Sequence, residues 1–424
     1  MALEVLRAVR RGVLADRAFD RRADSLGGAD RRLAQELAYG VLRLRGRLDH
    51  VLEPLVKGGI RRLDADVLDV LRLGAYQLLE LDRVPAYAAV SDAVEAAKAS
   101  AGTGAGALAN AVLRRLDREG AASSPFPARD EDPTGYLTTW GSHPRWLVER
   151  WLERLSLEEV ERLTEYDNAR PAAYLSVVGA REVALKRLHD AGIEAEPVAL
   201  CRGSIRMEPG EVARGLELVG GIVQDPGAAT VVDFMALDPG SRVVDLCAAP
   251  GGKAALLAAR GHEVFAFDVA RARLVRVLEN RSRLELSRLH VALADSTRPP
   301  LCGMPVILLD VPCTGTGTLA RHPDGRWRLR TADLEAMVEL QGRLLDAAAQ
   351  ALESSGLLVY STCSLEPEEN EEQVRAFLDR CEDFALEAPG AGAVAPELLD
   401  EGTLRATPHN HGIDGAYAVR LRRR

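Results

Sequence analysis

Apolar residues recur at near-helical spacing through the first part of the chain. Residues 32–43 carry a stripe of apolar positions typical of an amphipathic α-helix, and residues 67–81 repeat the pattern. The first stripe consists of Leu33, Leu37, Tyr39 and Val41. We therefore predict an all-α bundle for residues 1–120.

The middle of the chain changes from helical to mixed periodicity. Residues 119–133 are rich in Ala, Ser, Pro and acidic residues, a composition typical of a linker, which we place at 121–135. Apolar runs of strand length then alternate with a charged helical stretch, so we predict a small α+β module over 136–215. The segments on which this prediction depends are 174–178, 182–191, 194–200 and 204–207.

The last part of the chain, 216–424, alternates short apolar runs with helical stretches. Buried strands that are separated by helices are typical of a doubly wound parallel sheet, in which polar residues at the carboxyl ends of strands line a ligand crevice. Four of the runs contain or end in an aspartate, so we expect these carboxylates to converge on one site. The runs are 242–247, 263–268, 289–295, 306–310 and 356–363.

Size and composition fit a globular protein of several domains. The chain has 424 residues, of which 47% are hydrophobic and 28% charged, and this length exceeds what one core usually organises. The longest uncharged stretch, 99–113, is shorter than the roughly 20 residues of a membrane helix, and the charged first residues do not follow a secretory-signal pattern. We therefore predict a cytoplasmic protein with no membrane partner.

The six cysteines lie far apart and form no Cys-x-x-Cys pair. This spacing argues against a zinc site and, in a reducing compartment, against a disulfide framework. We predict no bound metal, and we expect a functional cysteine here to be catalytic. The six are Cys201, Cys247, Cys302, Cys313, Cys363 and Cys381.

The charge of the chain is uneven. A net charge of -9 and a pI near 5.6 are unusual for a protein that binds nucleic acid, because Lys and Arg contacts to phosphates normally supply most of the affinity. However, residues 1–62 contain fourteen Lys or Arg against eight Asp or Glu, and four of the last five residues, 420–424, are arginines. Basic ends on an acidic body permit contact with RNA.

A glycine-containing loop follows the first predicted strand of the last part, in the sequence Asp245-Leu-Cys-Ala-Ala-Pro-Gly-Gly-Lys253. Glycines between a strand and a helix let the backbone approach a ligand closely, and the amides at the helix start attract an anionic group. The spacing fits neither the Walker motif nor G-x-G-x-x-G. Asp268, at the end of the next predicted strand, stands where an acidic residue holds ribose hydroxyls, so we predict a cofactor that contains a nucleoside.

Two cysteines lie at predicted strand ends, Cys313 in Asp310-Val-Pro-Cys-Thr and Cys363 in Ser-Thr-Cys-Ser. Carbon 5 of cytosine is too weak a nucleophile to accept a methyl group unaided, but a thiolate that adds to carbon 6 converts the ring into a reactive enamine. A carboxyl group near ring N3 assists this addition, and a base must afterwards remove the carbon-5 proton. Two thiols and an acid suit this sequence of steps.

Together these motifs resemble those of the Sun-type RNA cytosine-C5 methyltransferases, in particular the RsmB-like small-subunit rRNA enzymes. The helical part resembles the NusB-like RNA-binding domain of those enzymes, in segments 71–79, 82–85, 89–95 and 110–115. The resemblance implies a multidomain enzyme with a Rossmann-like methyltransferase domain. It also implies S-adenosylmethionine as cofactor, small-subunit rRNA as substrate, no DNA partner and a monomeric state.

The resemblance also implies individual roles. Cys363 is the nucleophile, Cys313 assists proton removal or release of the methylated base, Asp310 contacts the cytosine, and Lys253 faces the reacting base. Asp268 holds the ribose, and Asp295 the adenine amine. The implied cofactor contacts are Cys247, Ala248, Ala249, Pro250, Gly251, Gly252, Lys253, Asp268, Asp295 and Asp310.

Three further segments resemble family segments that shape the RNA pocket, namely 224–225, 321–327 and 409–415. Two motifs depart from the family pattern. The family more often has Asp-Ala-Pro-Cys-Ser where this chain has Asp-Val-Pro-Cys-Thr at 310–314, a change that keeps every reactive atom. It also has Gln-Asp-Glu-Ala-Ser where this chain has Gln-Asp-Pro-Gly-Ala at 224–228, which removes a carboxylate and a hydroxyl.

Three alternatives remain open at the level of sequence. A DNA cytosine-C5 methyltransferase would use the same ring chemistry, but its nucleophile belongs to the Pro-Cys strand end. An RNA-binding assembly protein without catalysis would need neither thiol. A related enzyme could act on tRNA or on another rRNA position, since the sequence names no target nucleotide.

Overall fold

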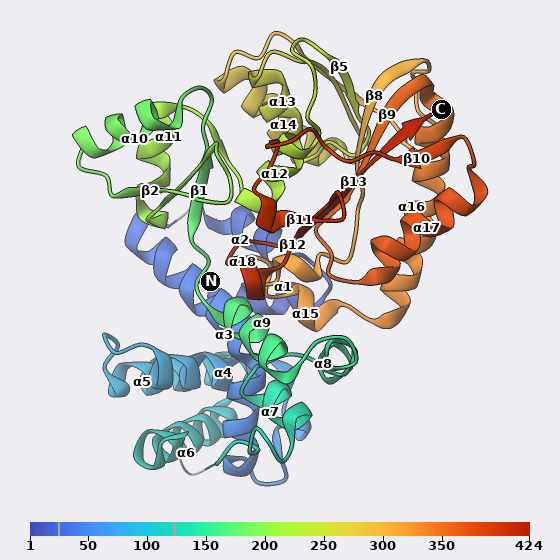
Figure 1. Cartoon of the computed structure of the whole chain (residues 1–424). Helices are drawn as coiled ribbons and strands as arrows, with labels where there is room; N and C mark the ends of the chain where they lie inside the picture. Colours follow the sequence, from blue (N-terminus) through green and yellow to red (C-terminus); the bar gives the residue numbers. More distant parts are fainter. Residues whose placement is uncertain (24–25, 122–123) are drawn as a thin grey trace. The chain divides into compact units, whose positions relative to one another are not determined.

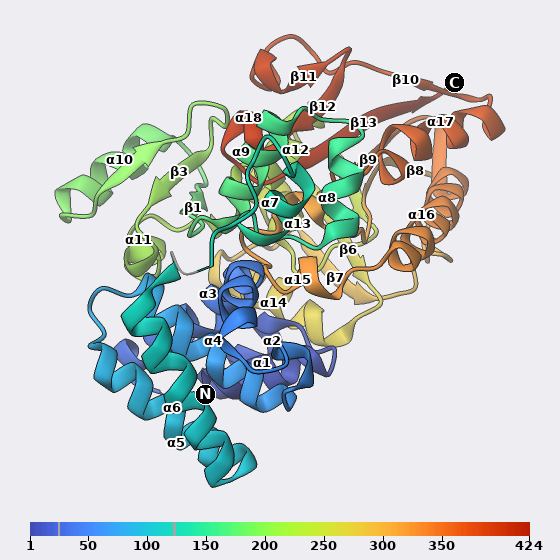
Figure 2. The same ribbon diagram turned by 90° about the horizontal axis from the view of Figure 1, so that it is seen from below.

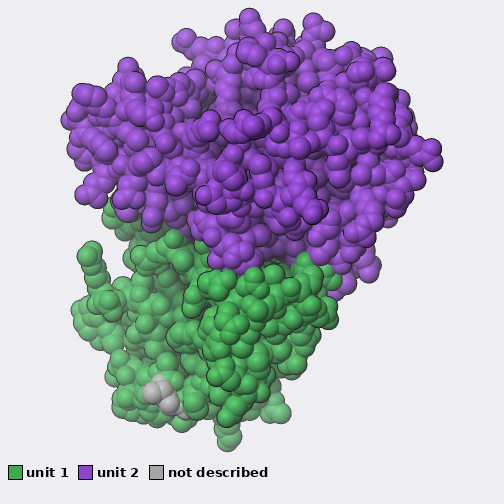
Figure 3. Space-filling view, viewed as in Figure 1, with its two compact units in different colours: residues 1–170, 319–328 green, residues 171–318, 329–424 purple. Residues whose placement is uncertain are grey.

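The computed structural model of the chain describes residues 1–23, 26–121 and 124–424 (Figure 1). The chain divides into two compact units, which Figure 3 shows in different colours. The first comprises Met1–Arg170 and Leu319–Arg328, and the second comprises Pro171–Thr318 and Leu329–Arg424. The first unit therefore continues past residue 120, where the sequence pattern places the end of the helical domain.

The first unit is all-helical. Its longer helices pack around a core of Ala, Val and Leu side chains, and close approach is possible because small residues stand at the crossings. At Gly74, for example, a Cβ atom would lie 2.5 Å from the side chain of Leu113. The helices are α1 (Ala2–Arg10), α2 (Ala15–Ala23), α3 (Gly28–Leu52), α4 (Ala65–Glu80), α5 (Ala86–Ala101), α6 (Thr103–Glu119), α7 (Pro133–Thr139), α8 (Arg145–Leu152), α9 (Leu157–Asn168) and α15 (Gly325–Arg328).

The sequence pattern places a linker at 121–135 and begins the α+β module at residue 136. In the structure, α7 to α9 belong instead to the first unit. Phe126 explains part of the difference, because its ring stacks on His50 at a centroid distance of 4.6 Å and meets Trp140 edge-on at 5.2 Å. A capping box between Ser156 and Glu159 starts α9. No helix in the described part of the chain is long and apolar enough to span a membrane.

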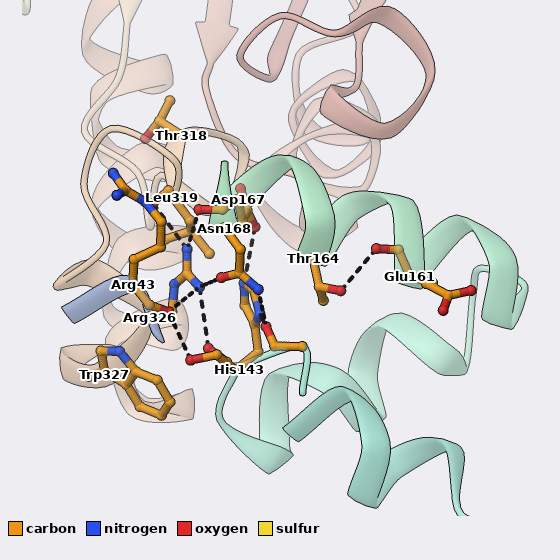
Figure 4. Close-up of polar contacts among 12 residues, drawn as sticks. Arg43, His143, Glu161, Thr164, Asp167, Asn168, Thr318, Leu319, Arg326 and Trp327 are labelled. Atoms are coloured by element: carbon orange, nitrogen blue, oxygen red, sulfur yellow. Dashed lines mark hydrogen bonds and ion pairs between the residues drawn. The ribbon is translucent and has the colours of Figure 1, made fainter. Parts of the chain in front are cut away.

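A short piece of the later sequence, Leu319–Arg328, belongs to the first unit through a buried arginine. Figure 4 shows the Arg326 guanidinium pointing at the end of α9, where it donates to Asn168 Oδ1 at 2.7 Å and to the Asp167 carbonyl at 2.9 Å. Arg326 is 0% exposed. Within segment 321–327, Arg326 therefore supports the helical unit from inside, and a role of the segment in the RNA pocket stays a prediction.

The charge of Arg326 is offset by a neighbouring acid rather than by solvent. Asp167 is fully buried and accepts a hydrogen bond from His143 Nε2 at 3.1 Å. Burial lowers the pKa of His143 to about 4 and that of Arg326 to about 10. His143 connects this cluster to the chain before α8, because its Nδ1 atom lies 2.7 Å from the Gly141 carbonyl while its Nε2 atom faces Asp167.

The second unit begins with a small antiparallel sheet in the order β2-β3-β1-β4. Apolar side chains of the sheet pack against α10 (Arg181–Asp190) and α11 (Val212–Val219), which confirms the predicted α+β module. The strands are β1 (Ala173–Ser176), β2 (Ala195–Pro197), β3 (Ser204–Met207) and β4 (Ile222–Val223).

The large sheet of the second unit has the order β11-β12-β13-β9-β8-β5-β6-β7, with β10 paired to β13. Strands β9, β8, β5, β6 and β7 are parallel, as the sequence predicts. They comprise β5 (Arg242–Asp245), β6 (Glu263–Asp268), β7 (Leu289–Leu293), β8 (Met304–Asp310) and β9 (Leu352–Thr362).

Alternation along the parallel strands divides the core between the two faces of the sheet. Val243 packs on one face with α12 (Pro226–Phe234), α13 (Gly252–Ala259) and α14 (Arg271–Arg283). Val244 packs on the other face with α16 (Thr331–Ala351) and α17 (Glu371–Arg380), which lie along β8 and β9 in both ribbon views (Figures 1 and 2).

The C-terminal residues extend the sheet with antiparallel strands. These are β10 (Phe384–Leu386), β11 (Leu399–Asp400), β12 (Thr403–Ala406) and β13 (Ala416–Arg423), and a short helix, α18 (Pro408–His411), precedes β13. The basic end of the chain forms ion pairs within this unit. Arg420 and Arg422 pair with Glu387, and Arg423 pairs with Asp383 at 2.9 Å.

Candidate active site

The chemically important side chains lie at the carboxyl ends of neighbouring parallel strands. Asp245, Asp268 and Asp310 end β5, β6 and β8, and Cys363 follows β9 directly. Register places Asp310 opposite Ser361, two residues before Cys363. The predicted convergence of carboxylates and thiols at one edge of the sheet is therefore observed for these residues.

The two thiols face each other. The Sγ atoms of Cys313 and Cys363 lie 3.4 Å apart, within range of an S–H···S hydrogen bond, and both residues are half-buried. This hydrogen bond, burial and the charge of Cys363 raise the pKa of Cys313 well above its ordinary value. The Cys313 thiol is therefore harder to deprotonate while Cys363 lies beside it.

An ion pair stands beside the thiols. Lys253 Nζ in α13 lies 2.8 Å from Asp310 Oδ2, and Ser361 Oγ donates to the other carboxylate oxygen at 2.7 Å. Burial acts against the charged form of Lys253, but Asp310 outweighs it, and with a further contribution from Cys363 the pKa of Lys253 is raised. Lys253 thus carries a positive charge that also favours the Cys363 thiolate.

Glycine is required in the loop that leads into α13. Gly251 has φ +103°, a left-handed conformation, and a Cβ atom there would lie 2.9 Å from Val277. A Cβ atom on Gly252 would lie 3.2 Å from the side-chain amide of Gln224. The backbone amides at the start of α13 are thus held in a tight turn that offers N–H groups to an anion.

Asp268 holds the same loop from the next strand. It is 4% exposed, and its two carboxylate oxygens accept hydrogen bonds from the amides of Ala249 at 3.1 Å and Ala270 at 2.7 Å. Each carboxylate oxygen can accept a second hydrogen bond. Asp268 can therefore both shape the loop and receive a hydroxyl group.

Asp295 follows β7 and is exposed, unlike the other strand-end acids. Its Oδ1 accepts hydrogen bonds from the amide and the hydroxyl of Thr297, at 3.0 and 2.8 Å, and these contacts lower the pKa of Asp295. Its other carboxylate oxygen remains available to a ligand amine.

Asp245 begins the glycine-containing motif, but the sequence alone assigns no role to it. It is 1% exposed, and its Oδ1 atom has no hydrogen-bond partner among the described residues. Burial, and then the charge of Asp310, raise the pKa of Asp245 to about 8. The Gln224 side-chain oxygen is likewise buried and unpaired within the described chain. Unsatisfied buried acceptors at a strand end indicate a position for a ligand donor.

Segments 224–225 and 409–415 join within the second unit. Asp225 caps α12 through the Gly227 amide and also accepts a hydrogen bond from the Asp414 amide at 3.1 Å, so this capping survives the departure at 226–228. Gly415 donates its amide to the Gly317 carbonyl at 2.7 Å, and a Cβ on Gly317 would collide with this backbone. The two segments therefore brace the loop after Cys313.

No group of three or more His, Cys, Asp or Glu side chains within residues 1–23, 26–121 and 124–424 is arranged to hold a metal ion.

Comparisons with known proteins identify the family. Models of three families match consecutive parts of the chain: the NusB family at residues 1–118, the RsmF/B-like ferredoxin-like domain at 143–212, and the 16S rRNA methyltransferase RsmB/F at 232–422. Ribosomal RNA small subunit methyltransferase B of Pseudomonas putida is 37% identical over 94% of this chain and 92% of its own. The chain belongs to the RsmB/F family of 16S rRNA methyltransferases.

Other relatives agree. The probable ribosomal RNA small subunit methyltransferase B of Bacillus subtilis is 32% identical over 95% of this chain and 93% of its own. A crystal structure of PH0851 aligns with a TM-score of 0.80 and 26% identity, covering 99% of this chain and 98% of that one. The RsmB/F enzyme described here is thus an S-adenosylmethionine-dependent RNA methyltransferase, and the predicted three-part fold, cofactor and RNA partner are confirmed.

Proposed function

We propose that this enzyme methylates carbon 5 of a cytosine in small-subunit rRNA through a covalent bond between Cys363 and carbon 6. The observation that carries the proposal is the pair of thiols, 3.4 Å apart, beside the Lys253–Asp310 ion pair. A simple methyl transfer to an exposed amine or hydroxyl would need neither thiol, whereas attack on carbon 6 and later proton removal need two separate groups.

Two observations support Cys363 as the nucleophile: the raised pKa of its partner Cys313, and the positive charge of Lys253, which interacts with Cys363. In the proposed first step the Cys363 thiolate bonds to carbon 6, and the electron pair of the carbon 5–carbon 6 bond becomes available at carbon 5. Asp310, held by Lys253 and Ser361, would assist the addition as a carboxylic acid that donates a proton to ring N3, and it would take that proton back when Cys363 leaves. Carbon 5 then takes the methyl group that S-adenosylmethionine supplies as its sulfonium substituent.

Release requires loss of the carbon-5 proton. Once Cys363 is bonded to carbon, Cys313 no longer has a thiolate as its hydrogen-bond partner or as a neighbouring charge, so two of the causes of its raised pKa, including the largest, are removed. Cys313 can then lose its own proton to solvent and accept the proton from carbon 5. The electron pair of that C–H bond restores the ring double bond, and the Cys363 thiolate leaves.

The cofactor site follows from the same geometry. We propose that the amides at the start of α13 bind the carboxylate of the methionine moiety and that unpaired Asp245 Oδ1 binds its amino group. Asp268 would hold the ribose hydroxyls, and Asp295 the adenine amine. The loop Cys247, Ala248, Ala249, Pro250, Gly251 and Gly252 would enclose the methionine end.

Asp268→Ala combined with Asp295→Ala is expected to weaken S-adenosylmethionine binding by at least about 100-fold, because each carboxylate hydrogen bond is worth roughly 1.5–3 kcal/mol. Isothermal calorimetry on the full-length protein measures the effect. Asp379→Ala, on the exposed side of α17, is the control and should leave affinity unchanged. Undiminished binding in the double variant would refute this site assignment.

The substrate is tested by mapping 5-methylcytosine in cellular RNA. Deletion of the gene should remove the modification from one cytosine of small-subunit rRNA, and the wild-type gene, but not the Cys363→Ala gene, should restore it. Loss of the mark from a tRNA, or from another rRNA position, would establish the alternative substrate. An unchanged map with altered ribosome assembly would favour a non-catalytic role. An rRNA substrate also supports the proposed cytoplasmic location.

A further inference from the structure

Glu369 is hydrogen-bonded to Thr314, the residue that follows Cys313, and is fully buried, at 0% exposure. Its Oε1 atom accepts hydrogen bonds from the Thr314 amide at 2.8 Å and from Gln341 Nε2 at 2.9 Å. Its Oε2 atom accepts a hydrogen bond from the Thr314 hydroxyl. These donors are neutral, and burial raises the pKa of Glu369. A buried carboxylate with only neutral donors around it is costly, so its presence beside the two thiols requires an explanation.

The peptide groups on both sides of Cys313 are held by this cluster. Glu369 holds the amide that follows Cys313, and Gln341 Nε2 donates to the carbonyl of Pro312, which precedes it, at 2.9 Å. The Tyr360 hydroxyl donates to the Glu369 carbonyl at 2.6 Å and so ties the cluster to β9. The backbone of Cys313 is therefore fixed, and its thiol is directed at Cys363.

The charges around the two thiols differ in sign. Lys253 carries a positive charge that interacts with Cys363, whereas the Glu369 carboxylate, which accepts a hydrogen bond from the next residue, Thr314, interacts with Cys313. Two N–H groups point at Glu369 Oε1, an arrangement that suits an ionised carboxylate, which is an acceptor only. A negative charge disfavours a thiolate nearby, and a positive charge favours one.

We propose that Glu369 is a positioning residue that assigns the roles of the two cysteines: it fixes the backbone on the C-terminal side of Cys313, and its charge disfavours a thiolate there, so that Cys363 is the thiolate. This inference rests on the proposed function, because it concerns the same two thiols. It adds a residue that acts through Thr314 and Cys313, and that touches neither the base nor the cofactor.

The test follows alkylation of each cysteine by iodoacetamide as a function of pH, with peptide mass spectrometry on the full-length protein in the absence of RNA. In the wild type, Cys363 should react at lower pH than Cys313. Glu369→Gln keeps an acceptor oxygen for the Thr314 amide but removes the charge, so the midpoint for Cys313 should fall by about one pH unit. Glu369→Asp, which keeps the charge, should remain closer to the wild type.

Glu372→Gln, an exposed position on α17, is the matched control and should leave both profiles unchanged. Circular dichroism verifies the fold of each variant. An unchanged Cys313 profile in folded Glu369→Gln protein would overturn the role of Glu369 alone. A wild-type protein in which Cys313 reacts at lower pH than Cys363 would instead contradict the proposed choice of nucleophile, so the two failures are distinguishable.

Discussion

Cys363→Ala is expected to reduce methyl transfer by at least about 10⁴-fold, since it removes the nucleophile that activates the base. Binding of S-adenosylmethionine should stay near the wild-type level, because the thiol attacks the cytosine and is not among the proposed cofactor contacts. Single-turnover assays with labelled cofactor measure the first quantity, and calorimetry measures the second.

Cys381→Ala is the control for this experiment, because Cys381 is a free cysteine after α17 that has no proposed role in the chemistry. It should retain activity close to that of the wild type. Appreciable residual turnover in Cys363→Ala protein would mean that another group attacks the base.

Cys313→Ala is expected to slow overall turnover by roughly 10²–10⁴-fold, the usual contribution of a general base, while leaving addition to carbon 6 possible. The covalent enzyme–RNA species should therefore accumulate as a band that resists denaturation, and Cys363→Ala protein should lack it. Adduct formed by Cys363→Ala and absent from Cys313→Ala would reverse the roles and restore the arrangement of the DNA enzymes.

The sequence predicts the catalytic centre better than it predicts the structure that supports it. The sequence alone predicts that Cys313, Cys363 and Asp310 lie close together. Each follows or ends a strand of a parallel sheet, and the carboxyl ends of such strands share one edge. The alternation of buried residues, as at Val243 and Val244, similarly fixes the faces of the sheet from local pattern alone.

Contacts between distant positions escape such reasoning. Glu369 holds Thr314 across 55 positions, and Arg326 holds Asn168 across 158. Neither residue is marked by periodicity, since a buried charge interrupts the hydrophobic pattern and resembles a surface position in sequence. A charged residue in a segment that resembles a family motif, as at 321–327, is the signal that could have suggested a buried role.

Composition also leaves the role of the basic C-terminal residues open. Their charge permits contact with RNA, but Arg420 is only 6% exposed and pairs with Glu387. Charge counted along the chain does not reveal which side chains an edge strand such as β13 neutralises within the protein.

The most direct test of the account uses RNA in which the target cytosine is replaced by 5-fluorocytosine. After attack and methylation, carbon 5 then carries fluorine and a methyl group but no proton, so the adduct cannot resolve. Wild-type enzyme should become permanently linked to this RNA in the presence of S-adenosylmethionine. Peptide mass spectrometry should find the nucleotide on Cys363, whereas a nucleotide on Cys313, or no adduct at all, would contradict the proposed mechanism.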